Sequence, residues 1–314
     1  MQIKSKKINK ESNWEKLGLL FCPQNISQSM MSYCSMPMIY LKENKSYRLF
    51  FSSRDSSNHP SVHYLDIKDI SKFNEIEVND KAVFSRGKFG HFDDNGVYSG
   101  TLVTHENMLY MFYSGRSNGV ENLFYMNIGL AVSVNGGDSF QRYKQTPILS
   151  RSEYDPWLVT APCVFKFKNK RFMIYTSGTA IFNDRTSRYD LKIATSSDFF
   201  NWEHTGITAI PLNDDEANLS TSTVIEIGGV LHMWFSVKPK IGEYRIGYAS
   251  SKDGINWTRD DDLLGLGVSE NGFDDKGLSY PNVFVHQSHL YMVYSGNHNG
   301  KDGCGLARFK ISNL

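Results

Sequence analysis

The chain has 314 residues and a formal net charge of +1, from 34 Lys and Arg against 33 Asp and Glu. This balance excludes a global field that would draw the protein onto nucleic acid or an anionic membrane, so any charge-based function must be local. Hydrophobic residues make up 40% and aromatic residues 13% of the chain, which excludes a disordered polymer and provides for a packed core. We expect a soluble globular protein that neither binds nucleic acid nor inserts into a membrane.

Residues 1–7 are polar and basic and no apolar stretch follows them, which argues against a secretory signal. No stretch approaches the roughly eighteen apolar residues of a membrane span. The cysteines show no CxxC spacing and indicate neither a zinc site nor a disulfide framework: Cys22, Cys34, Cys163 and Cys304. We interpret them as reduced and expect a cytoplasmic protein, with export lacking a visible signal as the alternative.

In chain order, the first predicted strand is residues 13–20, which begin Asn-Trp-Glu. After it, a segment rich in β-branched and aromatic residues recurs at a spacing of about sixty residues. Its copies are 47–53, 109–115, 171–178, 231–237 and 290–296. About ten residues before each copy lies a second apolar run, and the two predict a hairpin. These runs are 36–41, 100–104, 162–167, 221–227 and 281–285.

A third strand follows each hairpin, at 62–65, 128–133, 191–196, 246–251 and 305–309. A turn then leads to a fourth, edge strand at 135–140, 197–202 and 252–257. Repeats of four antiparallel strands with almost no helical periodicity predict an all-β, five-bladed β-propeller, a single domain over residues 1–314. A β-sandwich, the alternative, would not explain the sixty-residue period.

The two ends of the chain complement each other. The last repeat stops at Leu314, after its third strand and without an edge strand. The segment 13–20 begins Asn-Trp and matches the Asn-Trp segments of the later edge strands, which start at Asn201 and Asn256. We therefore predict that residues 1–22 supply the closing strand of the fifth blade, which pairs an otherwise open sheet edge.

In a propeller, the incoming loop before each innermost strand and the outgoing loop after the second strand emerge on one face. Incoming loops here carry Asp or Glu at similar distances before the innermost strand. Turn formation is an alternative explanation, because Asp and Asn favour turns wherever they occur. A mouth lined by acids, amides, aromatics and bases suits a polyhydroxylated ligand. The candidate binding residues are Arg54, Asp55, His91, Asp93, Ser99, Arg116, Trp157, Arg185, Lys238, Tyr280, Asn297 and His298.

Among these, Trp157 lies outside the repeated strand pattern, directly after an Asp-Pro pair in an incoming loop. An indole ring in that place could stack on the apolar face of a sugar. We predict that Trp157 stands in the mouth as a stacking platform; the alternative is a ring folded back over a blade.

Residues 92–103 (Phe-Asp-Asp-Asn-Gly-Val-Tyr-Ser-Gly-Thr-Leu-Val) resemble the Asp-x-x-Gly-aromatic-Ser-Gly-Ser segment that invertase-like enzymes place in their second blade. Residues 154–156 (Tyr-Asp-Pro) are similar to an Asp-Pro motif of the same superfamily. The whole chain resembles the five-bladed propeller glycosidases, a group of invertases, levansucrases, arabinanases, xylosidases and mannoside phosphorylases. The resemblance implies action on a carbohydrate.

The acids that the resemblance implies are missing from their usual strand positions. The first innermost strand reads Cys-Ser-Met-Pro at 34–37, the third Thr-Ala-Pro at 160–162 and the fourth Leu-Ser-Thr at 219–221. Glycoside cleavage generally needs two carboxyl groups, so these would have to come from the incoming loops. The catalytic candidates are Asp94, Asp155, Asp215 and Asp275.

Three functions stay open from the sequence. The first is a glycoside hydrolase-like enzyme that uses the incoming-loop carboxylates, and the second is a carbohydrate-binding propeller without catalysis. The third is an enzyme of bacterial surface-polysaccharide metabolism, in which Arg54, Arg116 and Arg185 would clamp the carboxylate or phosphate of an acidic sugar or sugar donor. No cofactor or metal is expected. Some members of the resembling superfamily bind a calcium ion at the propeller axis, but no set of calcium ligands can be identified in this sequence.

Overall fold

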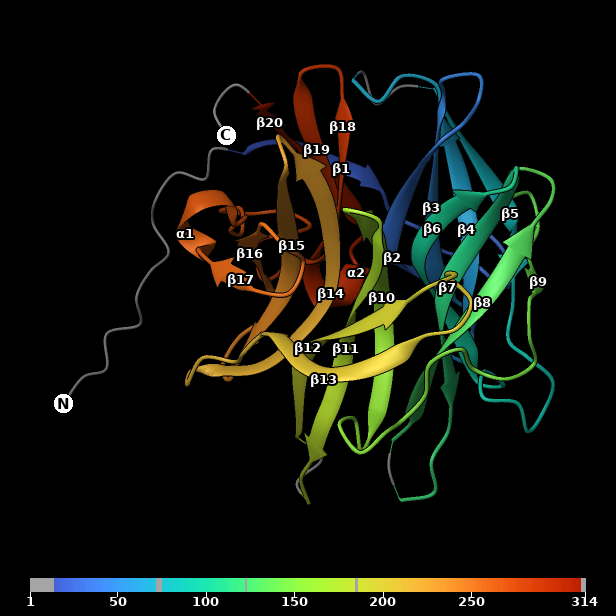
Figure 1. Cartoon of the computed structure of the whole chain (residues 1–314). Helices are drawn as coiled ribbons and strands as arrows, with labels where there is room; N and C mark the ends of the chain where they lie inside the picture. The colour runs from blue at the N-terminus through green and yellow to red at the C-terminus, as the bar shows by residue number, and fades with distance from the viewer. Residues whose placement is uncertain (1–13, 72–74, 122, 184–185, 312–314) are drawn as a thin grey trace.

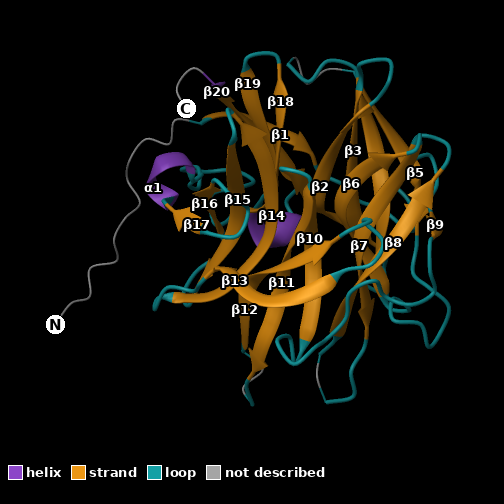
Figure 2. Cartoon of the chain, in the orientation of Figure 1, coloured by secondary structure: helices purple, strands orange, loops and turns teal. Residues whose placement is uncertain are grey.

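The computed structural model describes residues 14–71, 75–121, 123–183 and 186–311. Within these residues the regular structure is almost entirely β-strand, with two one-turn helices, α1 (Asp261–Leu264) and α2 (Asn297–Gly300) (Figures 1 and 2). No helix in the described ranges is long and apolar enough to cross a membrane. The part of the predicted closing segment that precedes residue 14 lies outside the described residues.

Three sheets each contain four antiparallel strands. The first sheet is β2 (Ser32–Leu41), β3 (Tyr47–Arg54), β4 (Pro60–Ile67) and β5 (Ile76–Phe84). The second is β6 (Gly96–His105), β7 (Met108–Ser117), β8 (Tyr125–Ser133) and β9 (Gln141–Arg142). The third is β18 (Ser279–His286), β19 (His289–Ser295), β20 (Cys304–Lys310) and, on its outer side, β1 (Glu15–Phe21).

The remaining strands form one eight-stranded sheet that divides into two halves. One half is β10 (Leu158–Phe167), β11 (Lys170–Ile181), β12 (Ser187–Ser196) and β13 (Glu203–Ile210). The other half is β14 (Glu216–Ile227), β15 (Val230–Pro239), β16 (Arg245–Ser251) and β17 (Trp257–Arg259). A single parallel pair, Tyr189 with Asn218, joins the halves. The prediction of an all-β chain built from antiparallel groups of four strands is therefore confirmed.

The first strands of these groups surround a common centre (Figure 1). Each of β2, β6, β10, β14 and β18 contacts the next, and β18 contacts β2. Neighbouring groups pack face to face through large apolar side chains. On β7, for example, Met111 and Tyr113 face the first sheet, whereas Tyr110 and Phe112 face β11. Both faces of the second strands are buried, which explains why they read as nearly continuous apolar runs.

The strand β1 joins the beginning of the chain to its end. It pairs antiparallel with β20, from Glu15 opposite Arg308 to Phe21 opposite Cys304. Just before it, Trp14 is 4% exposed and its Nε1 donates a hydrogen bond to the Leu264 carbonyl oxygen at 3.0 Å. The predicted pairing of the N-terminal segment with the last group of strands is thus present in the structure.

This closure predicts a large loss of stability in Trp14→Ala. The indole packs against Trp234 and Phe309, at centroid distances of 6.0 and 5.6 Å. Truncating a buried Trp typically costs about 3–5 kcal/mol in the free energy of unfolding. The matched control is Glu15→Ala, which removes only an exposed ion pair with Arg308 and should cost about 1 kcal/mol or less. Urea unfolding measures both, and equal small effects would contradict the role of this segment.

Candidate functional site

Every innermost strand is irregular near its start. Its pairing with the second strand shifts register there, in β2, β6, β10, β14 and β18 alike. A buried hydroxyl residue stands at each shift: Ser35, Ser99, Thr160, Ser220 and Ser279. Just after it, several non-glycine residues have a positive φ: Met36, Ala161, Thr221 and Tyr280. Backbone strain of this kind persists only where the surroundings hold it, and it is common at functional sites.

Hydroxyls from the neighbouring group hold these shifts in place. We call Ser52, Ser114, Thr176, Ser236 and Ser295 the bridging hydroxyls, one from each second strand. The first four accept hydrogen bonds from the backbone N–H groups of Ser99, Ala161, Thr221 and Tyr280, at 2.9, 2.8, 3.2 and 2.8 Å. The last, Ser295, donates to the Cys34 carbonyl oxygen at 2.7 Å. The bridges therefore run around the whole ring and fix the starts of the innermost strands.

Above these starts lies a cavity of about 370 Å³, which we call the mouth cavity. Its charged and aromatic lining is Arg54, Arg116, Tyr98, Phe124, Tyr189, Tyr244 and Tyr280. Its hydroxyl and amide groups come from Ser35, Thr160, Ser220, Asn58 and Asn299, and its aliphatic and thioether side chains from Met36, Met126 and Leu158. Among the described residues, none that lines this cavity is Asp or Glu.

The two arginines of the mouth cavity have no carboxylate partner among the described residues. Arg54 donates to Asn58 Oδ1 at 2.7 Å and to the Tyr98 hydroxyl at 3.3 Å. Arg116 lies over the Phe124 ring, 5.3 Å from its centroid. The Nε atoms of both guanidinium groups are buried without a hydrogen-bond partner. Buried donors of this kind are costly unless a ligand satisfies them, and a guanidinium favours an oxyanion.

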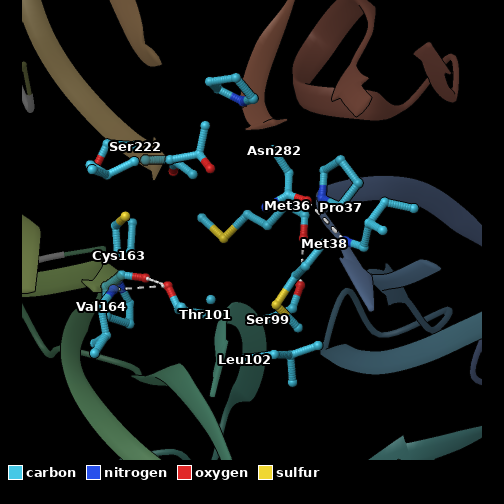
Figure 3. A pocket seen from close by; sticks show the side chains of 18 residues that line it. Met36, Pro37, Met38, Ser99, Thr101, Leu102, Cys163, Val164, Ser222 and Asn282 are labelled. Carbon is cyan, nitrogen blue, oxygen red and sulfur yellow. Dashed lines mark hydrogen bonds between the residues drawn. The ribbon is translucent and has the colours of Figure 1, made fainter. Parts of the chain in front are cut away.

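A second cavity, of about 210 Å³, lies on the axis between the innermost strands. Figure 3 shows its lining, which includes Met36, Thr101, Cys163, Ser222 and Asn282. Met36 also lines the mouth cavity, so the two adjoin. No group of three or more His, Cys, Asp or Glu side chains in the described part of the chain is placed to hold a metal ion.

Three acids of the incoming loops share one structural arrangement. Each is at most 1% exposed and accepts a hydrogen bond from a tyrosine twenty residues later: Asp93 from Tyr113, Asp155 from Tyr175 and Asp274 from Tyr294. Each also pairs with a basic side chain of the outermost strand: Arg142, His204 and Lys16, at 2.7, 2.9 and 2.6 Å. In the other two groups phenylalanine occupies the tyrosine position, at Phe51 and Phe235. These acids brace the outer strand against the second strand.

The mouth cavity is lined neither by Asp93, a predicted binding residue, nor by Asp155, a predicted catalytic residue. The Asp155 carboxylate is 0% exposed and lies in the wall between sheets. Burial would raise its pKa, but hydrogen bonds from His204, Ser152 and Ser177 and the charge of Lys192 outweigh burial and lower the pKa to about 2. Asp155 is therefore ionised at neutral pH and is a poor candidate for a proton donor.

The other catalytic candidates lie in turns outside the mouth cavity. Asp94 is half-buried and accepts a hydrogen bond from the Gly90 N–H at 2.9 Å. Asp275 accepts one from Asn297 Nδ2 at 2.8 Å, and Asp215 is exposed. A catalytic role for these three stays a prediction.

Of the predicted binding residues, Arg54, Arg116 and Tyr280 line the mouth cavity. Ser99 is buried below it and donates to the Met36 carbonyl oxygen at 2.6 Å. Arg185 lies outside the described residues.

The remaining predicted binding residues mostly satisfy their own loops. Asp55 accepts hydrogen bonds from two N–H groups of its turn, and Asn297 bonds to the backbone of the incoming loop before β18. Lys238 donates to the Gly242 carbonyl oxygen, and His298 lies 3.7 Å from Asp302. His91 is half-buried, and its Nδ1 has no hydrogen-bond partner.

Trp157 does not stand open in the mouth. Its side chain is 6% exposed and packs against Phe124 and Tyr189, at centroid distances of 5.8 and 5.4 Å. Its Nε1 donates to the Phe124 carbonyl oxygen at 3.3 Å. Burying the large indole behind these two rings lets the rings themselves line the cavity. Phe124 and Tyr189 line the mouth cavity, whereas Trp157 does not.

Sequence reasoning missed the tyrosines Tyr98, Tyr189 and Tyr244, and the asparagines Asn58 and Asn299. A signal was present for two of them. Both follow an outgoing loop: Tyr189 is near the start of the third strand β12, and Tyr244 directly precedes the third strand β16. A search for aromatic residues just after each outgoing loop would have found both.

The bracing role of Asp155 predicts that Asp155→Asn is several kcal/mol less stable at pH 7, because it breaks a buried ionic cluster. The lowered pKa means that the carboxylate contributes stability above about pH 4, and that this contribution is lost as the pH falls toward 2. The gap between wild type and variant should therefore narrow over that range. Asp215→Asn, at an exposed position, is the control and should be near neutral. Thermal melting from pH 7 to 2.5 checks this, and a pH-independent gap would contradict it.

Comparison with known proteins agrees with this architecture. Residues 88–211 match the family described as glycosyl hydrolases family 32 N-terminal domain. An uncharacterised protein of Mycobacterium tuberculosis, Rv1502, is 29% identical over 298 residues, which cover 94% of this chain and 98% of that protein. A β-1,2-mannobiose phosphorylase of Thermoanaerobacter sp. is 26% identical over 159 residues, 47% of this chain and 51% of that protein.

Solved structures share the fold at low sequence identity. A β-1,2-mannobiose phosphorylase from Listeria innocua, in complex with β-1,2-mannobiose, has a TM-score of 0.73 at 11% identity, over 95% of this chain and 96% of that one. An endo-arabinase from Bacteroides thetaiotaomicron has a TM-score of 0.65 at 15% identity, over 89% and 94%. The resemblance of this chain to the β-propeller glycosidases and their phosphorylase relatives is confirmed.

Proposed function

We propose that this protein is a five-bladed, carbohydrate-active propeller whose mouth cavity holds a sugar together with an oxyanion. The oxyanion is either an acidic group on the sugar or inorganic phosphate beside it. Antiparallel groups of four strands and the closed ring of β2, β6, β10, β14 and β18 support the blade count. Four free cysteines suit a reducing, cytoplasmic setting.

The observation that carries the proposal is the pair Arg54 and Arg116. Both line one cavity, both have a buried Nε without a partner, and no described acid pairs with either. A guanidinium binds a carboxylate or phosphate through two parallel hydrogen bonds, and this interaction gains strength where water is excluded. An oxyanion at this point would satisfy donors that the protein itself leaves open.

The rest of the lining suits the sugar. The rings of Phe124 and Tyr189 offer apolar faces, and Thr160 Oγ1 and Asn299 Oδ1 are buried polar atoms without a partner. Burial raises the pKa of Tyr244 and Tyr280, so both phenols stay protonated and can donate to sugar oxygens. Stacking faces combined with directional polar groups are the usual composition of a small-ligand site.

The lining also bears on the chemistry. Hydrolysis by two carboxyl groups requires both to reach the scissile bond, and the described lining contains neither Asp nor Glu. The relatives named as β-1,2-mannobiose phosphorylases indicate a different use of the same fold, in which phosphate is a reactant. Transfer to phosphate needs one proton donor, for the sugar that leaves, because phosphate itself attacks. Binding alone needs none and so fits the described lining of the mouth cavity best, and transfer to phosphate fits it better than hydrolysis does.

Calorimetry with mannobiose in the presence and absence of phosphate, with hexose 1-phosphates and with uronic-acid oligosaccharides tests this proposal. We expect binding that depends on the oxyanion and weakens at least about tenfold in Arg54→Gln and Arg116→Gln, since each variant removes a charged donor. The matched control is Arg86→Gln, an exposed arginine outside the cavity, which should bind normally.

Assays of the same mixtures for sugar phosphate separate the two sources of the oxyanion. Sugar phosphate formed from mannobiose and phosphate indicates transfer, whereas binding of an acidic sugar without turnover indicates a binding module. If neutral sugars bind equally well to wild type and to both arginine variants, the oxyanion proposal fails. If turnover instead depends on Asp94, Asp215 or Asp275, hydrolysis through the incoming loops takes its place.

A further inference from the structure

Two cysteines from opposite ends of the chain meet at the closure of the ring. Cys34 lies in β2, the innermost strand of the first sheet, and Cys304 begins β20 in the last sheet. Their Sγ atoms are 2.8 Å apart, and both side chains are 0% exposed. The two residues are 270 positions apart in sequence. A single covalent bond here would join the first and last sheets.

We propose that Cys34 and Cys304 form a site for an oxidative cross-link, a disulfide that closes the ring covalently. Disulfide bonds are about 2.05 Å long, so the sulfur atoms would need to approach by less than about 1 Å. Each thiol loses its proton, and the two sulfurs lose two electrons in total. A low-molecular-weight disulfide such as oxidised glutathione accepts both electrons and both protons and leaves as two thiols.

The positions of the other two cysteines do not favour a disulfide bond. Cys163 lines the axial cavity from β10, on a different group of strands. Cys22 is half-buried, and its Sγ contacts Gln24 Nε2 at 3.7 Å and the Lys301 carbonyl oxygen at 3.9 Å rather than a second sulfur. Burial raises the pKa of the Cys34 thiol, so the buried pair should react more slowly than an exposed thiol.

The position gives the cross-link a consequence for the mouth cavity. The Cys34 carbonyl oxygen accepts the hydrogen bond from Ser295 that completes the ring of bridging hydroxyls. The next two residues, Ser35 and Met36, line the mouth cavity. A disulfide at Cys34 would therefore lock the wall of the cavity at the seam where the chain ends meet. This inference is independent of which ligand the cavity binds.

The test treats the folded protein with oxidised glutathione, then denatures it in the presence of N-ethylmaleimide and counts the alkylated cysteines by mass spectrometry. The count should fall from four, the number of cysteines in the chain, to two. On a non-reducing denaturing gel, the oxidised chain should migrate faster, because a loop of 270 residues keeps it compact. Reduction with dithiothreitol should reverse both changes. Oxidation should also shift the urea midpoint of unfolding to a higher concentration, since a long closed loop restricts the unfolded chain.

Four single variants identify the bond. Cys34→Ala and Cys304→Ala should lose the mobility shift, whereas Cys22→Ala and Cys163→Ala should keep it. Circular dichroism confirms that each variant is folded before oxidation. Four free thiols after prolonged oxidation of the wild type would overturn the proposal. So would a shift that is lost in Cys22→Ala, which would assign the bond to Cys22, or one that survives in Cys34→Ala.

Discussion

The bridging hydroxyls are the constraint on which the site depends. Each innermost strand breaks its register near the mouth, and a Ser or Thr from the preceding group satisfies the backbone atom that the break exposes. A buried hydrogen bond of this kind contributes about 1 kcal/mol, but leaving the backbone group unpaired would cost more. The bridges thus allow residues such as Met36 and Tyr280 to hold a positive φ and turn their side chains into the mouth cavity.

The same geometry explains why the mouth carries little negative charge. At the strand positions where the resemblance implies acids, this chain has the non-acidic runs Cys-Ser-Met-Pro at 34–37, Thr-Ala-Pro at 160–162 and Leu-Ser-Thr at 219–221. The acids of the incoming loops that are fully buried, such as Asp155, are committed to tyrosine and basic partners in the walls. With no described carboxylate lining the cavity, Arg54 and Arg116 keep their full positive charge available to a ligand.

The sequence predicts the architecture well, because the sixty-residue period and the alternation of strands and turns can both be read along the chain without knowing which residues are in contact. It also predicts the pairing of residues 13–20 with the last repeat, since Trp14 repeats the edge-strand pattern. The site is harder to predict, because the position of a residue in an incoming loop does not determine whether its side chain points to the axis or into the wall between sheets. Asp155 points into the wall toward Tyr175, and Trp157 lies behind Phe124. A tyrosine twenty residues after the aspartate, present wherever the buried aspartate is, would have revealed the bracing role.

We propose that the mouth cavity is built around an oxyanion rather than around a pair of carboxylates. The most direct measurement is a crystal structure of the protein grown with mannobiose and phosphate, or with an acidic oligosaccharide. We expect electron density for the oxyanion in contact with the guanidinium groups of both Arg54 and Arg116, with a sugar ring against Phe124 or Tyr189. A sugar bound among the incoming-loop acids Asp94, Asp215 or Asp275, with the two arginines untouched, would contradict it.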